Sequence, residues 1–314
     1  MSRRTLTFAM SVLTVGALAA CGSSSDPLGS STTTSAAGAS SGSSASTSIV
    51  VGSADFSESV LLAEIYAGAL KAKGVNATTK LNIGSREIYL KALDDGSIDV
   101  VPEYTGALAY YYDKNFAETD PTKVYDGLTG LLPDTLQVLK ASAAEDNDSI
   151  NVTAETAKKN NLKSIADLKP VAGELTLGAP PEFKERPQGI PGLTKTYGVT
   201  FGSFRPLKGA QLVQALKNGQ VQAANIFSTD PAIAANGFVT LTDDQRLFGS
   251  QNVVPLLAKS KNSAEVTAAL DAVSAKLTTA VLSDLLKQTD IDKADPQTVA
   301  AKFLADNGLG GFTS

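Results

Sequence analysis

The sequence contains no histidine and no tryptophan, and its only cysteine is Cys21. Without histidine the chain cannot build a Ser-His-Asp triad, and with a single cysteine near the N-terminus the folded part has neither a thiol nucleophile nor a Cys/His zinc site. Lysine and arginine form no long run, and the formal net charge is -5. We therefore expect no nucleic-acid partner, no metal and no cofactor.

The overall composition is that of a soluble globular protein. The chain has 314 residues, of which 43% are hydrophobic and 19% are charged. Sequences of this length and balance can bury a sizeable core and differ from disordered or fibrous chains.

The first 20 residues have the features of an export signal. Arg3 and Arg4 give a positive start, and residues 5–20 are mostly apolar without a charge and end directly before Cys21. This stretch is too short to span a bilayer, which takes about 20 apolar residues. It resembles the bacterial lipobox, so we expect cleavage after residue 20, lipidation of Cys21 and export to the outer face of the bacterial cell membrane. The alternative is an ordinary secretory peptide with a coincidental cysteine.

A low-complexity linker follows the lipidation site. Residues 22–47 are serine, glycine, threonine or alanine except at Asp26, Pro27 and Leu28. Such a composition cannot bury enough apolar surface to offset the entropy of ordering, so we interpret residues 21–47 as a lipidated cysteine with a flexible linker. No later segment reaches 18 apolar residues, which leaves the lipid as the expected anchor.

Residues 48–314 alternate short apolar runs with amphipathic stretches, and this alternation predicts an α/β fold of two lobes. The expected strands are 49–51, 78–83, 98–101, 150–153, 175–178, 221–226, 238–241 and 253–258. The expected helices are 57–73, 85–94, 122–139, 210–217, 263–287 and 296–306.

An internal echo marks two aromatic residues. Residues 92–105 align without a gap on residues 215–228, and each copy runs from a helix end through a glycine and a strand to an aromatic, Tyr104 or Phe227, followed by a hydroxyl side chain. Ligands of open α/β sheets bind beyond the carboxyl ends of strands, where this pattern puts both rings. The alternative is that both rings fill hydrophobic cores.

Several segments, taken in order, resemble the substrate-binding proteins of osmoprotectant ABC importers, which take up glycine betaine, choline, carnitine and related compounds. The most specific is Pro-Glu-Tyr-Thr-Gly at residues 102–106. The others are residues 53–58, 84–87, 165–168, 186–189, 197–198, 228–230 and 241–244.

The resemblance implies the type II periplasmic-binding-protein fold, in which two α/β lobes close on a ligand. Lobe one is then expected to comprise residues 48–141 and 253–314, and lobe two residues 142–252. The two crossings between the lobes would fall near residues 139–149 and 242–253.

The resemblance also implies a ligand site. A quaternary ammonium has no N–H to donate, so it is held by aromatic ring faces. Tyr104 matches a ring of the cage from lobe one, and Phe227 falls where lobe two presents another. Arg186 matches an arginine that in some relatives grips a carboxylate, with a solvated loop charge as the alternative.

Four more residues complete the expected contacts. Phe56 and Ser57 lie where the first strand opens into its helix, so that helix start could meet an anion, although Phe56 could equally belong to the core. Ser228 and Thr229 follow Phe227 directly.

The sequence also departs from the family pattern. Ala107 stands where relatives often carry a polar residue, and the tyrosines that relatives supply near the crossings are replaced by residues 146–149 and by Ser250 or Gln251. The cage is therefore depleted of rings, which leaves open a ligand other than glycine betaine. Tyr89 or Phe248 are the candidates to replace the missing rings.

Together these features predict a monomeric, lipid-anchored binding protein that captures a small cationic or zwitterionic solute and delivers it to an ABC permease. The alternatives are a sensor lipoprotein without transport and a binding protein for a different small apolar or zwitterionic solute. A third hypothesis is an enzyme with the same fold. Porphobilinogen deaminase has a comparable architecture but needs a cysteine to hold its cofactor, and this folded part has none.

Overall fold

The computed structural model describes residues 48–310. The predicted signal peptide, the lipidated Cys21 and the linker up to residue 47 lie outside the described residues. Two five-stranded mixed sheets, each covered by helices, make the fold α/β with two lobes, as the sequence predicts.

Lobe one is built on the first sheet, whose strand order is β2-β1-β3-β10-β4. Its strands are β1 (Ile49–Gly52), β2 (Ala77–Lys80), β3 (Val100–Tyr104), β4 (Leu136–Val138) and β10 (Val253–Ala258). Strands β2 and β3 flank β1 in parallel, whereas β10 runs antiparallel to both β3 and β4. The carboxyl ends of β1 and β3 therefore open at the same edge.

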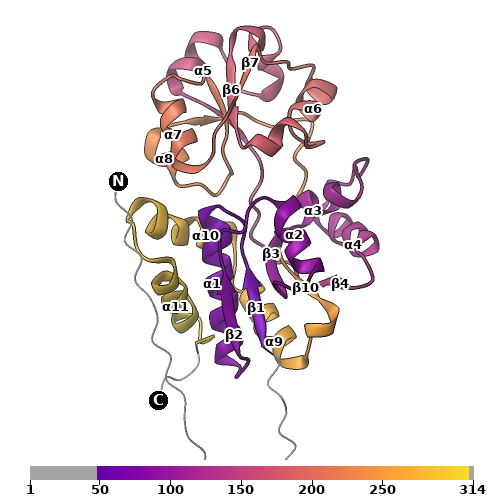
Figure 1. Cartoon of the computed structure of the whole chain (residues 1–314). Coiled ribbons are helices and arrows are strands. Elements are labelled where there is room, and N and C mark those ends of the chain that lie inside the picture. Colours follow the sequence, from indigo (N-terminus) through magenta and orange to yellow (C-terminus); the bar gives the residue numbers. More distant parts are fainter. Residues whose placement is uncertain (1–47, 311–314) are drawn as a thin grey trace, which may run out of the picture. The chain divides into compact units, whose positions relative to one another are not determined.

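Helices cover both faces of this first sheet. They are α1 (Ser57–Ala72), α2 (Arg86–Asp94), α3 (Thr105–Tyr112), α4 (Pro121–Leu131), α9 (Ala264–Ser274), α10 (Thr279–Leu286) and α11 (Pro296–Asp306). In α1 the apolar residues Leu61, Leu62, Ile65 and Leu70 are fully buried, and the helix packs against α9 and α11 (Figure 1). A second cluster lies beneath α2, α3 and α4.

Two expected helices are corrected by the structure. Helix α4 ends at Leu131 rather than at residue 139, because Pro133 cannot continue it and disfavours helical backbone at the residue before it. Residues 136–138 instead pair with β10 as strand β4. The long helix expected over residues 263–287 is two helices, and Thr278 starts the second by accepting a hydrogen bond from the Val281 amide.

Lobe two is built on the second sheet, of order β7-β6-β8-β5-β9. Its strands are β5 (Ile150–Val152), β6 (Thr176–Ala179), β7 (Ser203–Pro206), β8 (Ala223–Asn225) and β9 (Val239–Thr240). Its α-helices are α5 (Ala154–Asn160), α6 (Ile190–Gly192), α7 (Gly209–Lys217) and α8 (Ala232–Asn236). Short 3-10 or π turns complete the chain at Ile165–Leu168, Ala172–Glu174, Pro181–Lys184, Leu193–Tyr197, Lys259–Lys261 and Lys287–Ile291.

Two chain segments pass between the sheets, and they run beside each other. The Val253 amide donates to the Ala144 carbonyl at 2.9 Å, and the Asp146 amide donates to the Gln251 carbonyl at 3.1 Å. The exact lobe limits given above, at residues 141/142 and 252/253, stay a prediction. Within residues 48–310 no helix has the length and apolar character needed to cross a membrane.

Candidate functional site

Three aromatic residues lie at the ends of strands or the start of a helix. Tyr104 is the last residue of β3, and Phe56 precedes the first turn of α1, both in lobe one. Phe227 follows β8 by two residues in lobe two. This is the position beyond the strand ends at which the internal echo puts Tyr104 and Phe227.

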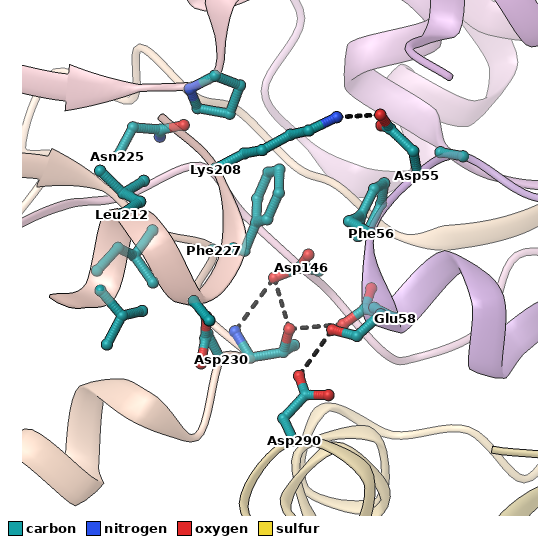
Figure 2. A pocket seen from close by; sticks show the side chains of 18 of the residues that line it. Asp55, Phe56, Glu58, Asp146, Lys208, Leu212, Asn225, Phe227, Asp230 and Asp290 are labelled. Atoms are coloured by element: carbon teal, nitrogen blue, oxygen red, sulfur yellow. Dashed lines mark hydrogen bonds and ion pairs between the residues drawn. The ribbon is translucent and has the colours of Figure 1, made fainter. Parts of the chain in front are cut away.

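The three rings meet at one cavity of about 830 Å³. The Phe56 ring lies between the other two, with centroid distances of 6.3 Å to Tyr104 and 5.5 Å to Phe227. Figure 2 shows Phe56 and Phe227 facing each other across this cavity. The two expected cage residues therefore do not fill separate cores, and Phe56 belongs with them.

The Pro-Glu-Tyr-Thr-Gly segment holds Tyr104 in place through a buried ion pair. Glu103 is fully buried and accepts two hydrogen bonds from the guanidinium of Arg86, at 2.8 and 3.0 Å. The Tyr89 hydroxyl and the Tyr104 amide donate to the same carboxylate, at 2.6 and 2.9 Å. A buried carboxylate needs such partners to offset its desolvation. Glu103 therefore orients the backbone that presents Tyr104.

The glycine of this segment allows close contact with the second crossing. A Cβ atom at Gly106 would lie 2.4 Å from the Ser250 carbonyl oxygen, so a side chain does not fit there. The Ala107 amide donates to Gln251 Oε1 at 2.8 Å, and Gln251 Nε2 donates to the Phe248 carbonyl. Gln251 is thus a structural link rather than a free polar group at the cavity.

A carboxyl pair lies beside the rings. The Tyr104 hydroxyl donates to Glu58 Oε1 at 2.6 Å, and Glu58 Oε2 lies 2.6 Å from Thr229 Oγ1. Thr229 Oγ1 is also 2.8 Å from Asp146 Oδ1, to which the Thr229 amide donates at 3.1 Å. Glu58, Asp146 and Thr229 are all buried. A residue of lobe two is thereby joined to α1 of lobe one.

Burial shifts the proton affinities of these acids. Removal from water raises the pKa of Glu58 to about 7, although hydrogen bonds from Thr229 and Tyr104 act in the opposite direction. Burial, and then the nearby charge of Glu58, raise the pKa of Asp146 well above its usual value. Burial likewise raises the pKa of Asp148 and Asp230, which line the same cavity.

Three of the four basic side chains at the cavity are already engaged by acids of the chain, and the fourth, Lys293, donates to the Asp290 carbonyl at 2.7 Å. Arg86 is held by Glu103, and Lys208 of lobe two forms an ion pair with Asp55 of lobe one (Figure 2). Arg186 of lobe two lies 3.4 Å from the carboxylate of Glu87 in α2. Although partial burial acts the other way, the Ser85 hydroxyl and Arg186 lower the pKa of Glu87 to about 2. Arg186 thus contacts lobe one. The alternative given above, a loop charge surrounded by solvent, does not describe it.

The cavity is consequently acidic where the rings are. Glu58, Asp146, Asp148 and Asp230 line it without an ion pair to any lysine or arginine of residues 48–310. Opposite charge attracts strongly in a region that excludes water. A positively charged guest therefore fits this site better than an anion does.

The remaining predicted residues lie in different surroundings. Ser57 lines the cavity but is exposed, and its hydroxyl donates to Asp290 Oδ2 at 2.7 Å, so it is engaged by an acid rather than offered to an anion. Ser228 is exposed and is not part of the cavity wall. Its hydroxyl accepts a hydrogen bond from the Asn147 amide. Tyr89 does line the cavity, whereas Phe248 is buried in the core of lobe two.

Sequence reasoning missed Glu58 and Asp146 as site residues. Glu58 lies in the first turn of α1, where an acidic residue is ordinarily explained by the helix dipole. Asp146 lies in a polar stretch of the first crossing. The signal available was position, since Glu58 is the last residue of the matching segment 53–58 and Asp146 lies in the stretch that replaces a tyrosine of the relatives. In the described part of the chain, no group of three or more acidic or cysteine side chains is arranged to hold a metal ion.

Comparison with known proteins identifies the family of this chain. The sequence profile of OpuAC, described as the substrate binding domain of ABC-type glycine betaine transport systems, matches residues 47–306. The chain belongs to this family. It is a substrate-binding domain of the kind that serves ABC transport systems, and its two-lobed α/β fold agrees with this.

Individual relatives of this OpuAC-family chain have low sequence identity to it, but the alignments cover most of its length. The glycine betaine-binding protein YehZ of Escherichia coli is 29% identical over 83% of this chain and 90% of its own. The carnitine transport binding protein OpuCC of Listeria monocytogenes is 26% identical over 83% and 87%. A crystal structure titled as a glycine betaine/carnitine/choline ABC transporter has a TM-score of 0.67 at 23% identity, covering 83% of this chain and 99% of that one.

Proposed function

We propose that this protein captures a small quaternary ammonium solute outside the cytoplasm and delivers it to the permease of an ABC importer. The observation that carries the proposal is the meeting of Phe56 and Tyr104 from lobe one with Phe227 from lobe two at one acidic cavity. YehZ and OpuCC, whose names state glycine betaine and carnitine, support this ligand class.

The rings supply the contacts that this ligand class needs. A quaternary ammonium offers no N–H, so hydrogen-bond acceptors cannot grip it directionally. Ring faces attract its diffuse charge by about 0.5 to 2 kcal/mol each, and more when water is excluded. The neighbouring carboxyl groups of Glu58 and Asp146 add attraction without needing contact geometry.

A carboxylate group on the ligand would have to bind Arg186, which already contacts acids of the chain. Arg186 reaches the cavity, but its guanidinium lies 3.4 Å from Glu87 and 4.0 Å from Glu182. A zwitterion such as glycine betaine would compete with Glu87 for it, whereas choline makes no such demand. We therefore place choline-like cations ahead of betaines for this chain.

Delivery would use the two lobes. A ligand that touches Tyr104 in one lobe and Phe227 in the other stabilises their approach, and the joined form is what a permease can recognise. We propose that the chain acts as a monomer without catalytic activity, held at the membrane by a lipid on Cys21 and the linker up to residue 47.

A thermal-shift screen with choline, glycine betaine and carnitine tests the proposal. A ligand at about 100 times its dissociation constant stabilises the native state by about 2.7 kcal/mol. The matched control is 3,3-dimethylbutan-1-ol, which has the shape of choline without its charge. We expect choline to raise the melting temperature and the neutral alcohol to leave it unchanged. Equal shifts with both compounds, or none with any ammonium compound, would refute recognition of a quaternary cation.

A further inference from the structure

One hydroxyl group lies between two carboxyl groups at the junction of the lobes. Thr229 Oγ1, from lobe two, is 2.6 Å from Glu58 Oε2 in α1 and 2.8 Å from Asp146 Oδ1 in the first crossing. Glu58 is 3% exposed and Asp146 is also 3% exposed. Water therefore does not mediate these contacts.

Glu58, Thr229 and Asp146 form a trio whose hydrogen bonds need more protons than are present if both acids are ionised. A threonine hydroxyl carries one proton and can donate it to one oxygen only. The Thr229 amide and the Tyr104 hydroxyl donate to Asp146 Oδ1 and Glu58 Oε1, so neither supplies the second contact of the hydroxyl. With two carboxylates, one short O···O contact would have no proton in it. One carboxyl group must therefore hold a proton, which completes a chain from Glu58 through Thr229 to Asp146.

The surroundings of the trio favour this extra proton. No lysine or arginine of the described residues forms an ion pair with Glu58 or Asp146. The titratable and charged groups that face the trio from the elements around it are Asp55, Arg86, Tyr89, Tyr104, Asp148, Arg186, Lys208, Asp230, Asp290 and Lys293. Arg86, Arg186 and Lys208 among them are paired with other acids. Lys293 donates only to a backbone carbonyl, but it is one cation against the carboxyl groups of Asp148, Asp230 and Asp290, so the formal charge balance around the trio is negative.

We propose that Glu58 and Asp146 share one proton through Thr229 while the cavity is empty, and that a cation bound at the rings replaces this proton. The second half of this statement rests on the proposed function, whereas the first half does not. The trio is then a proton-held clasp between the lobes. Two negative charges remain once the proton leaves, and either a proton or a cationic guest offsets their repulsion.

Two measurable consequences follow. The empty protein should hold its lobes together at pH 5.5 and release them at pH 8.5, because the shared proton is lost in between. A cation should displace up to one proton on binding, and its affinity should therefore rise up to about tenfold per pH unit, since linkage between two ligands is reciprocal.

Energy transfer between dyes on the two lobes measures the clasp without a ligand. Cysteines replace the exposed Lys91 in α2 and Lys217 in α7, in a full-length chain with Cys21→Ser. We expect higher transfer at pH 5.5 than at pH 8.5. Equal transfer at both pH values would overturn the proposal.

Three variants separate the clasp from general effects on lobe contact. Glu58→Gln imitates the protonated acid, so transfer should stay high at both pH values. Thr229→Val removes the bridging hydroxyl at nearly constant shape, so transfer should be low at both. Asp55→Asn is the control, because it breaks the ion pair with Lys208, which also joins the lobes but lies outside the trio. It should lower transfer equally at both pH values, and loss of the pH difference in this control would count against the trio.

Calorimetry with choline tests the exchange. Titrations at pH 7 in two buffers of different ionisation enthalpy give the number of protons released on binding. We expect release by the native chain and none by Glu58→Gln. Choline binding without proton release would overturn the exchange and leave the proposed function standing. If choline does not bind, the proposed function fails for this probe, and the ligand-free transfer measurement decides the clasp.

Discussion

The ring of Phe56 in lobe one lies 5.5 Å from the ring of Phe227 in lobe two, with 33° between their planes. A carbon atom between two rings needs about 3.5 to 4.0 Å on each side. A methyl group of an ammonium ligand therefore does not fit between these rings as they stand. A ligand that places a methyl group between these two rings must therefore part the lobes or turn one ring aside, whereas the rest of the cavity is open to it as it stands.

Removal of the Tyr104 ring should weaken ligand binding. Tyr104→Ala deletes a ring face at the cavity, and we expect the affinity for choline to fall by at least about 1 kcal/mol in calorimetry. Tyr104→Phe keeps the ring but loses the hydrogen bond to Glu58, so it should retain more of the affinity than the alanine variant. An unaltered affinity in Tyr104→Ala would remove this residue from the site.

The contribution of lobe two can be measured at Phe227. Phe227→Ala removes the ring that Phe56 contacts, and we expect roughly a tenfold loss of choline affinity, about 1.4 kcal/mol. Phe204→Ala is the matched control, because Phe204 is a partly buried phenylalanine of strand β7 away from the cavity. If both variants lose affinity to the same extent, the effect belongs to the stability of lobe two and not to the site.

The buried pair of Arg86 and Glu103 should matter for stability. Glu103→Gln leaves the guanidinium of Arg86 buried without its counter-charge, and loss of one partner of such a pair typically costs about 3 to 5 kcal/mol. Urea unfolding measures the change. The control is Asp306→Asn, which breaks the exposed pair with Lys302 and should cost at most about 1 kcal/mol. A Glu103→Gln variant as stable as this control would contradict the structural role of the pair.

Features with a strong local signal could be predicted from the sequence. The apolar period of α1 and the glycines after its end and after α2 gave helices close to their actual bounds, because local packing and backbone conformation decide them. The echo of residues 92–105 in residues 215–228 put Tyr104 and Phe227 at equivalent places. Their meeting at one cavity follows from the pairing of whole lobes, which no local pattern contains.

The features missed depend on long-range contacts. Strand β4 forms because residues 136–138 pair with β10, more than 100 positions later in the chain. Glu58 is buried only because Thr229 and Tyr104 provide hydrogen bonds from remote segments. A glutamate in a first helical turn has no feature in the sequence that distinguishes burial from exposure.

The buried acid should also make folding stability depend on pH. The pKa of Glu58 is raised from its ordinary 4.5 to about 7 by burial, so between these values the folded chain holds a proton that the unfolded chain has lost. Its contribution to the free energy of unfolding is therefore complete below pH 4.5 and is lost as pH rises through about 7, with a slope of up to about 1.4 kcal/mol per pH unit. Urea unfolding from pH 5 to 8 measures this slope, which should flatten in Glu58→Gln. Glu64→Gln, on the same helix but outside the cavity, should keep the native slope. If the slope persists in Glu58→Gln, the titrating group is another residue.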